Sequence, residues 1–363
     1  MRPPALLCAA LLALAPAAAA AQPAEAAYPA PADGLYTAMI AAVPADNGDR
    51  RPMSGEAATI ADTGSLVEIA LGTTGDHNGN YPWASVTKQV LATMALQLVE
   101  ENRLSLDALA ASYIVLPRQR RAAMPTVRQL LRHQAGLRNP DDTPADARGI
   151  SSFYLDASTD PVEWCLTGRK APQRKGFAYN NCDYIVLGRI LEAASGKSLE
   201  ALFQEKIAEP AGLEATRFSD IADPVPFEMG DATDWRWVAG YGASAALVGP
   251  VSDMALFSRA LADGRLLKPE SLEVLWSADA DLGYMALGQW VFPANLAGCE
   301  GPVRIVERRG AIGRYEVRNF ILPDQGRYLS VVELDPDQDF GEIWSGEGLA
   351  YDLLSKTFCG GAQ

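Results

Sequence analysis

The sequence predicts an α/β protein in which an antiparallel sheet is flanked by helices and carries an inserted, mostly helical lobe. Two observations lead to this prediction. Segments typical of strands lie near both ends of the chain, whereas apolar residues at helical spacing dominate from Ser85 to about Trp237. A chain of 363 residues is also long enough to bury a large core between several layers. A sheet formed from both chain ends, with the helical segment inserted, satisfies this order of elements.

Residues 1–21 have the pattern of a cleavable secretory signal peptide. Arg2 precedes an apolar run through Leu14, and the small residues Ala19 and Ala21 satisfy the usual cleavage rule. The apolar run is too short to span a bilayer. We therefore expect a periplasmic or secreted protein whose single mature domain covers residues 22–363, with a flexible Ala/Pro-rich leader through residue 32.

Four predicted strands lie outside the helical middle of the chain. We expect a sheet lobe at about residues 33–84 and 240–363, a helical lobe at about residues 85–239, and a cleft between them. A helix over Gly348–Phe358 should cover the sheet. The predicted strands are Leu66–Leu71, Leu287–Phe292, Val317–Leu322 and Tyr328–Leu334.

The Ser-x-x-Lys sequence Ser85-Val-Thr-Lys88 stands at the start of an apolar helical run that ends near Glu100. Three residues is just under one helical turn, so Lys88 would share a helix face with Ser85. This spacing predicts a nucleophile with a base beside it. Lys88 can act as a base only if burial or a neighbouring cation lowers its pKa.

A second polar motif, Tyr179-Asn180-Asn181, lies where a loop enters a predicted helix, and we expect Asp183 to cap that helix. A tyrosine hydroxyl near a lysine can transfer a proton, and an asparagine amide can hold a substrate carbonyl. Ser-x-x-Lys alone often occurs by chance. The combination of Ser85, Lys88, Tyr179 and Asn181 favours a catalytic site.

On these motifs the chain resembles the serine β-lactamase and penicillin-binding-protein superfamily. The likeness is to the branch that holds class C β-lactamases, D-alanyl-D-alanine carboxypeptidases, D-aminopeptidases and related esterases. It extends from about Trp83 to the C-terminus and includes the segments Glu101–Asp107, Pro125–Leu137 and Gly240–Phe257. The resemblance implies a β-lactamase-like fold. It also implies that Ser85 is the acylated nucleophile, that Lys88 and Tyr179 transfer the proton, and that Asn181 orients the substrate.

The third motif of that superfamily, Lys-Thr-Gly or His-x-Gly on a strand, corresponds here to Arg308-Arg309-Gly310-Ala311. Gly310 would still allow close approach of a substrate, and the N–H of Ala311 would join that of Ser85 in an oxyanion hole. Arg308 departs from the pattern. Its guanidinium keeps the positive charge but cannot release a proton near neutral pH. We consider two roles for it: electrostatic or carboxylate-binding in the cleft, or ion pairing with Glu307 or Glu316.

Loss of Cys8 with the signal peptide would leave four cysteines in a compartment that permits disulfides. Four cysteines allow three pairings. A Cys165–Cys182 bond would brace the Tyr179 loop, and a Cys299–Cys359 bond would tie the C-terminal helix to the sheet. Free buried thiols are the alternative, and the sequence does not decide between them.

Composition limits the other functional classes. The net charge of −14 and the pI near 4.7 provide no basic surface for nucleic acid. The mature chain holds only His77 and His133, without clustered metal ligands and without the Gly-x-Ser-x-Gly elbow of a Ser-His-Asp hydrolase. No phosphate-binding glycine loop is present. We expect no cofactor and no metal, and a small-molecule or peptide substrate as the partner.

The predicted function is a serine hydrolase that acts through an acyl-serine intermediate on an ester, a β-lactam, or a D-amino-acid peptide or amide. Two alternatives stay open at this point. One is a catalytically silent secreted ligand-binding protein of the same fold, and the other is a transpeptidase-like acyl transferase that passes the acyl group to an amine. Oligomeric state is not predicted.

Overall fold

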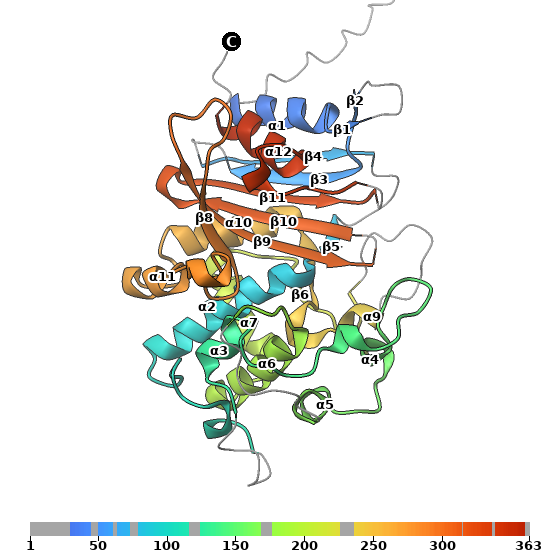
Figure 1. Cartoon of the computed structure of the whole chain (residues 1–363), viewed down its shortest axis with the longest axis vertical. Coiled ribbons are helices and arrows are strands. Elements are labelled where there is room, and N and C mark those ends of the chain that lie inside the picture. The colour runs from blue at the N-terminus through green and yellow to red at the C-terminus, as the bar shows by residue number, and fades with distance from the viewer. Residues whose placement is uncertain are drawn as a thin grey trace, which may run out of the picture.

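The computed structural model describes residues 30–44, 50–60, 64–72, 79–115, 124–167, 176–225, 236–313, 315–335 and 338–359. Within these ranges a six-stranded sheet lies between two groups of helices (Figure 1), and every neighbouring pair of strands in it is antiparallel. Both chain ends contribute strands, as the sequence predicted. In order across the sheet they are β4 (Leu66–Leu71), β3 (Gly55–Ile60), β11 (Arg327–Glu333), β10 (Tyr315–Leu322), β9 (Val303–Ile312) and β8 (Trp290–Ala294).

One face of the sheet is covered by two helices from opposite ends of the chain, α1 (Ala30–Ile40) and α12 (Leu349–Phe358) (Figure 1). Side chains of both helices form an apolar core with that face. The expected flexible leader through residue 32 is therefore too long, because α1 begins at Ala30. The predicted signal segment 1–21 lies outside the described residues.

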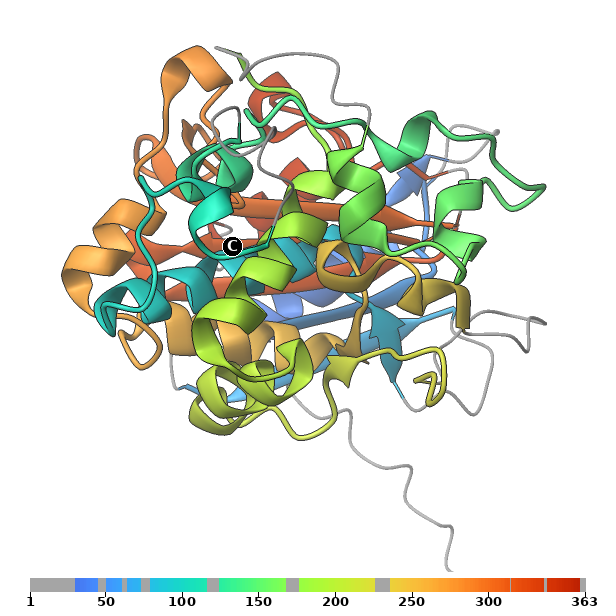
Figure 2. The same cartoon turned by 90° about the horizontal axis from the view of Figure 1, so that it is seen from below.

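The other face packs on α10 (Val251–Ala262) and α2 (Thr87–Glu100), beyond which lies the helical lobe (Figures 1 and 2). No helix in the described ranges is long and apolar enough to cross a membrane. The remaining helices are α3 (Val127–Leu131), α4 (Ser152–Leu155), α5 (Pro161–Leu166), α6 (Asn181–Ser195), α7 (Leu199–Phe203), α8 (Glu209–Ala211), α9 (Arg236–Ala239) and α11 (Pro269–Leu275), with a π-helical stretch at Gln204–Ala208.

Two small sheets complete the fold. In the first, β7 (Leu247–Pro250) lies between β5 (Asn80–Pro82) and β6 (Arg217–Phe218). This sheet ties the segment that precedes α2 to the start of α10. The second sheet pairs β1 (Val43–Pro44) with β2 (Arg50–Arg51).

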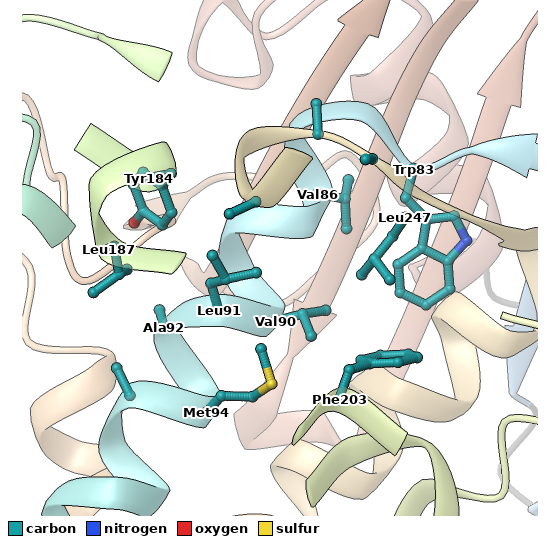
Figure 3. Close-up of a cluster of buried hydrophobic side chains, with 14 of the residues drawn as sticks. Trp83, Val86, Val90, Leu91, Ala92, Met94, Tyr184, Leu187, Phe203 and Leu247 are labelled. Carbon is teal, nitrogen blue, oxygen red and sulfur yellow. The ribbon is translucent and has the colours of Figure 1, made fainter. Parts of the chain in front are cut away.

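Helix α2 is the central element of the core. Its residues from Thr87 to Leu98 are all buried, polar ones included. Figure 3 shows its apolar side chains, among them Val90, Leu91 and Met94, projecting between side chains of α6, α7 and β7. A helix that is buried all round is held rigidly by its neighbours. It can therefore present the residues of its first turn in a fixed orientation.

The predicted strand boundaries agree well for β4, β10 and β11 but not for β8. That strand was expected from Leu287 and begins at Trp290. Gly288 explains the delay, because it adopts a φ of +77° where a Cβ atom would come within 2.8 Å of the Lys88 carbonyl oxygen. The backbone turns there instead of extending. Strand β3 was not predicted, since its small residues lack a strand pattern.

Two disulfides join segments that are distant in sequence. Cys165 of α5 bonds Cys182 in the first turn of α6, and Cys299 bonds Cys359 after α12. The pairings considered from the sequence are therefore those observed, and the free-thiol alternative is wrong. The first bond holds the start of α6, where Tyr179 and Asn181 stand, against α5.

We predict that the double substitution Cys165→Ala/Cys182→Ala lowers the free energy of unfolding by about 3 kcal/mol, the usual value for a loop of this size. The sequence separation is 17 residues. Urea denaturation measures the loss. The control Cys299→Ala/Cys359→Ala removes the bond across 60 residues, far from α6. The rate at which a serine-directed acylating reagent labels Ser85 should fall only in the Cys165→Ala/Cys182→Ala variant. Equal labelling rates in the two double variants would show that the first bond does not hold the Tyr179 loop in place.

Candidate active site

Ser85 lies at the start of the predicted helix, in a 3₁₀ turn (Ala84–Val86) directly before α2. Ala84 has a φ of +44°, a left-handed conformation that is uncommon for residues with a side chain. Trp83 anchors the turn, since its backbone N–H donates to the Leu247 carbonyl of β7 over 2.8 Å. The buried Trp83 ring lies beside Leu247 and Val86 (Figure 3). Strain of this kind persists where the surroundings over-determine it.

Lys88 is fully buried in the first turn of α2, one turn after Ser85. Its Nζ lies 2.9 Å from Ser85 Oγ, 2.7 Å from Asn181 Oδ1 and 2.8 Å from the Ser244 carbonyl oxygen. The two carbonyl oxygens can only accept hydrogen bonds. A neutral amine would donate its two hydrogens to them and point its lone pair at the Ser85 hydroxyl.

The surroundings of Lys88 favour that neutral form. Burial lowers the pKa of Lys88 well below its usual value, and the positive charge of Arg308 lowers it further. Asp141 and Asp183 oppose this shift with smaller effects. A lysine in such an environment can act as a base near neutral pH.

Tyr179 reaches the same hydroxyl from the loop before α6. Its phenol oxygen lies 2.5 Å from Ser85 Oγ and 3.1 Å from Asn181 Oδ1. Burial raises the pKa of Tyr179, although Arg308 and the hydrogen bond to Ser85 oppose the rise. Tyr179 therefore keeps its proton near neutral pH and can donate it.

Asn181 orders the polar groups of the site. Its Oδ1 accepts from Lys88, while its Nδ2 donates to Tyr154 Oη over 2.8 Å and to Asp141 Oδ2 over 3.1 Å. The Tyr154 hydroxyl in turn donates to Asp141 Oδ1 over 2.6 Å. These bonds fix which way the Asn181 amide faces. The exposed Asp141 carboxylate is thereby linked to the buried amine of Lys88.

The sequence-based assignment of the α6 cap is wrong. Asn180 caps the helix by accepting from the Cys182 N–H over 2.8 Å, and its own amide donates to the Leu137 carbonyl. Asp183, which was expected to cap, is instead fully buried in the first turn. The helix cap therefore lies three positions earlier than the sequence pattern indicated.

Arg308 projects from β9 towards Ser85. Its Nε donates to the Ser85 carbonyl oxygen over 2.8 Å, and its guanidinium carbon lies 5.5 Å from the centre of the Tyr179 ring. The side chain is fully buried, and neither Nη atom has a hydrogen-bond partner of standard geometry among the described residues, although the guanidinium interacts with the Tyr179 phenol. Burial without an anionic partner lowers the pKa of Arg308, but a guanidinium keeps its charge.

The alternative of ion pairing for Arg308 is wrong. Side chains alternate along a strand, so Arg308 faces α2 whereas Glu307 and Arg309 face α1 and α12. Arg309 takes the ion pairs instead, with Glu307 at 2.8 Å and Glu342 at 2.6 Å. The two adjacent arginine side chains thus leave β9 on opposite faces of the sheet, although both guanidinium groups lie 5.2 Å from the centre of the Trp290 ring.

Gly310 and Ala311 follow Arg308 on β9. A Cβ atom on Gly310 would lie 2.7 Å from the Ser85 backbone nitrogen, so only glycine permits this approach. Ile312 of β9 pairs with Tyr315 of β10 next to the hairpin turn. The two residues on either side of a two-residue hairpin turn are hydrogen-bonded to each other through their backbones. Because the ladder alternates, Ala311 directs its N–H away from β10, towards the edge that β8 leaves open beyond Trp290.

These groups line a cleft of about 540 Å³. All seven residues predicted from the sequence contribute to it or contact those that do. In the described part of the chain no group of three or more His, Cys, Asp or Glu side chains could hold a metal ion. Sequence reasoning missed Asp141, Tyr154, the Ser244 carbonyl and Trp290, which have no motif of their own. The residues that line the cleft include Ser85, Asp141, Tyr179, Asn181, Arg308 and Gly310.

Comparison with known proteins identifies relatives in sequence. A protein-family model described as Beta-lactamase matches residues 23–331. A D-aminopeptidase of Cereibacter sphaeroides is 28% identical over 180 residues, which cover 46% of this chain and 34% of that protein. Penicillin-binding protein 4 of Amycolatopsis lactamdurans is 27% identical over 63% of this chain and 64% of its own length. The chain therefore spans about a third of the D-aminopeptidase that it matches.

Solved structures show the same fold. A D-stereospecific amidohydrolase from Streptomyces sp. superposes with a TM-score of 0.69 at 22% identity, covering 91% of this chain and 99% of that one. A D-amino acid amidase from Ochrobactrum anthropi gives 0.66 at 20% identity, with coverage of 89% and 97%. At these identities the likeness concerns the fold alone.

We predict that Gly310→Ala displaces the Ser85 turn, since the added Cβ meets backbone atoms that cannot rotate away. The free energy of unfolding should fall by about 1–3 kcal/mol. Labelling of Ser85 by a serine-directed acylating reagent should slow at least tenfold. Gly176→Ala is the matched control, because open space surrounds Gly176. Equal labelling rates in the two variants would contradict the close approach.

Proposed function

The chain belongs to the beta-lactamase family, and from this membership we propose that it is a serine hydrolase that forms an acyl ester on Ser85. One observation carries the proposal. The Ser85 hydroxyl lies within hydrogen-bond distance of both Lys88 and Tyr179, in an open cleft. A nucleophile with two proton-transfer groups in contact is the arrangement that acyl transfer requires.

In the proposed acylation Ser85 Oγ attacks the substrate carbonyl while its proton passes to the neutral Lys88 amine. The backbone N–H groups of Ser85 and Ala311 stabilise the oxyanion. Tyr179 donates its proton to the leaving nitrogen or oxygen, and the proton held by Lys88 restores the tyrosine. Water then cleaves the acyl ester with the same groups acting in reverse. No cofactor takes part in these steps.

Arg308 has an electrostatic role in this mechanism. Its buried charge disfavours a second positive charge on Lys88, so it keeps the amine available as a base. It also holds the Ser85 carbonyl, which fixes the backbone next to the nucleophile. A lysine or histidine at this position could itself release a proton, whereas an arginine supplies charge alone.

The proposed substrates are amides or short peptides of D-amino acids with a free amino group. The names of the related D-aminopeptidase and of the structurally similar amidases support this class. The cleft supports it too, because the Asp141 carboxylate at its rim is exposed and positioned by Asn181 and Tyr154. A carboxylate there can bind an ammonium group. Esters and β-lactams can react through the same acyl-serine intermediate, so both are compared with the D-amino-acid amides in the experiment below.

We propose further that the protein is secreted or periplasmic. The signal pattern at residues 1–21 supports this location. So do the two disulfides, since such bonds persist in oxidising compartments.

Turnover of D- and L-alanine p-nitroanilide, a short-chain p-nitrophenyl ester and a chromogenic cephalosporin tests the proposal. We expect the D-amide to exceed the L-amide in kcat/KM. Ser85→Ala should lose on the order of 10³-fold or more on every substrate, and Tyr179→Phe should lose most on the amide, whose leaving group needs a proton. An active Ser85→Ala variant would overturn the mechanism. Cleavage of the cephalosporin alone would overturn the substrate class.

Asp141→Asn tests the ammonium contact. We expect a higher KM for D-alanine p-nitroanilide, because a neutral amide no longer attracts the ammonium, and little change in KM for the N-acetylated substrate. The comparison of the two substrates is the internal control. A parallel rise in both KM values would assign Asp141 a structural role only.

Arg308→Met tests the charge effect on Lys88. Arg308 lowers the Lys88 pKa, so its removal should raise that pKa. Since the base must be unprotonated, the acid limb of kcat/KM should move to higher pH. Arg308→Lys, which keeps a cation, should move it less. An acid limb that stays in place in Arg308→Met would contradict the electrostatic role.

A further inference from the structure

Behind Lys88 and Tyr179 lies a buried pair of titratable side chains that the mechanism above does not use. His133 Nδ1 and Asp183 Oδ2 are 3.4 Å apart, and both side chains are almost completely inaccessible. Asp183 belongs to the first turn of α6, and His133 to the turn that follows α3. Neither Asp183 oxygen has a hydrogen-bond partner of standard geometry among the described residues.

The contacts of His133 show which atom of its ring lacks a proton. The Asn180 backbone N–H donates to Nδ1 over 3.3 Å, so Nδ1 presents a lone pair. The neighbouring Asp183 oxygen also presents lone pairs. Two buried acceptors at 3.4 Å repel each other unless one of them carries a proton directed at the other. A proton on the Asp183 carboxyl group removes this repulsion by sharing the single lone pair of Nδ1 with the Asn180 N–H, while Nε2 has no hydrogen-bond partner among the described residues.

We propose that Asp183 is held as a neutral carboxylic acid by His133, and that this neutral pair is a positioning element that keeps Lys88 unprotonated. An ionised Asp183 would act as a counter-ion for Lys88 and hold the proton on its amine. A protonated Asp183 removes that counter-ion without leaving a cavity behind α2. The inference rests on the proposed role of Lys88 as a base.

The charges around the pair place the proton on the carboxyl group. Burial raises the pKa of Asp183 well above its usual value, and only a protonated Lys88 would oppose this rise. Burial lowers the pKa of His133, the charge of Arg308 on β9 lowers it further, and a protonated Lys88 on α2 would add to this effect. The other titratable groups that face the pair are Tyr179 and Tyr184, whose phenols keep their protons.

The position of His133 supports a role beyond filling space. Its φ of +56° is the left-handed conformation that closes α3, where the His133 N–H donates to the Leu130 carbonyl and the Gln134 N–H to the Gln129 carbonyl. Its ring packs on that of Tyr179 with the centres 4.7 Å apart. The pair therefore contacts one proton-transfer residue directly and influences the other through charge.

The first test locates the proton without measuring turnover. The chain contains two histidines, so the His77→Gln variant with ¹⁵N-labelled histidine gives the signals of one ring. At pH 7 we expect the ¹⁵N shift of a nitrogen without a proton at Nδ1 and that of a protonated nitrogen at Nε2. A ring protonated at Nδ1, with or without a second proton at Nε2, would overturn the proposal. This readout is independent of activity, so it separates failure of the pair from failure of the proposed hydrolase.

The second test compares pH profiles of two variants at Asp183. Asp183→Asn retains an N–H donor for His133 and no charge, so the acid limb of kcat/KM should stay where it is in the wild type. Asp183→Ala removes the donor, and we expect its kcat to fall at least tenfold with KM little changed. The kcat of Asp183→Asn should stay close to that of the wild type. A shift of the acid limb to lower pH in Asp183→Asn would show that the native carboxyl group is ionised and would overturn the inference.

Discussion

The site depends on the burial of one amine. Lys88 is enclosed by α2, α6 and the turn that carries Ser244, and each of its neighbours within hydrogen-bond distance is an oxygen. A charged amine without a carboxylate partner is costly in such a place, so the low-dielectric surroundings themselves favour the neutral base. The rigidity of α2, which is buried on all sides, keeps the lone pair directed at Ser85. If water entered this pocket, the pKa of Lys88 would rise towards its usual value and the amine would be protonated.

Close backbone contacts make that burial possible. Gly310 lets β9 approach the Ser85 nitrogen, and Gly188 lets α6 approach the turn before β7, where an added Cβ would lie 2.4 Å from the Ala243 Cβ. That turn carries the Ser244 carbonyl to Lys88. A larger side chain at either glycine would separate two elements and admit water. The absence of a side chain at these two glycines is therefore as important for the site as the positions of the polar side chains.

The sequence predicted the parts of the site that local spacing determines. Ser85 and Lys88 share a helical turn, and Tyr179 and Asn181 share a loop, so each pair is visible in the chain. Residues that act through tertiary contact were not visible: Asp141 joins Asn181 from 40 positions away, and Ser244 contributes only its backbone. Asp183 was misassigned because an acidic residue at the start of a helix usually caps it. Here Asn180 satisfies the free N–H group, which releases Asp183 to face the interior.

The two arginines of β9 show why one substitution in a family motif has to be interpreted from the structure. Strand alternation sends Arg309 into a network with Glu307 and Glu342 and leaves Arg308 with the Ser85 carbonyl as its hydrogen-bond acceptor. A charge paired with a carboxylate has a weak field beyond the pair, whereas an unpaired buried charge acts on its neighbours at full strength. The pKa values of Lys88 and His133 are both lowered by Arg308. In the proposed mechanism an arginine at this position therefore performs the electrostatic part of the motif's function, and the proton transfers fall to Lys88 and Tyr179.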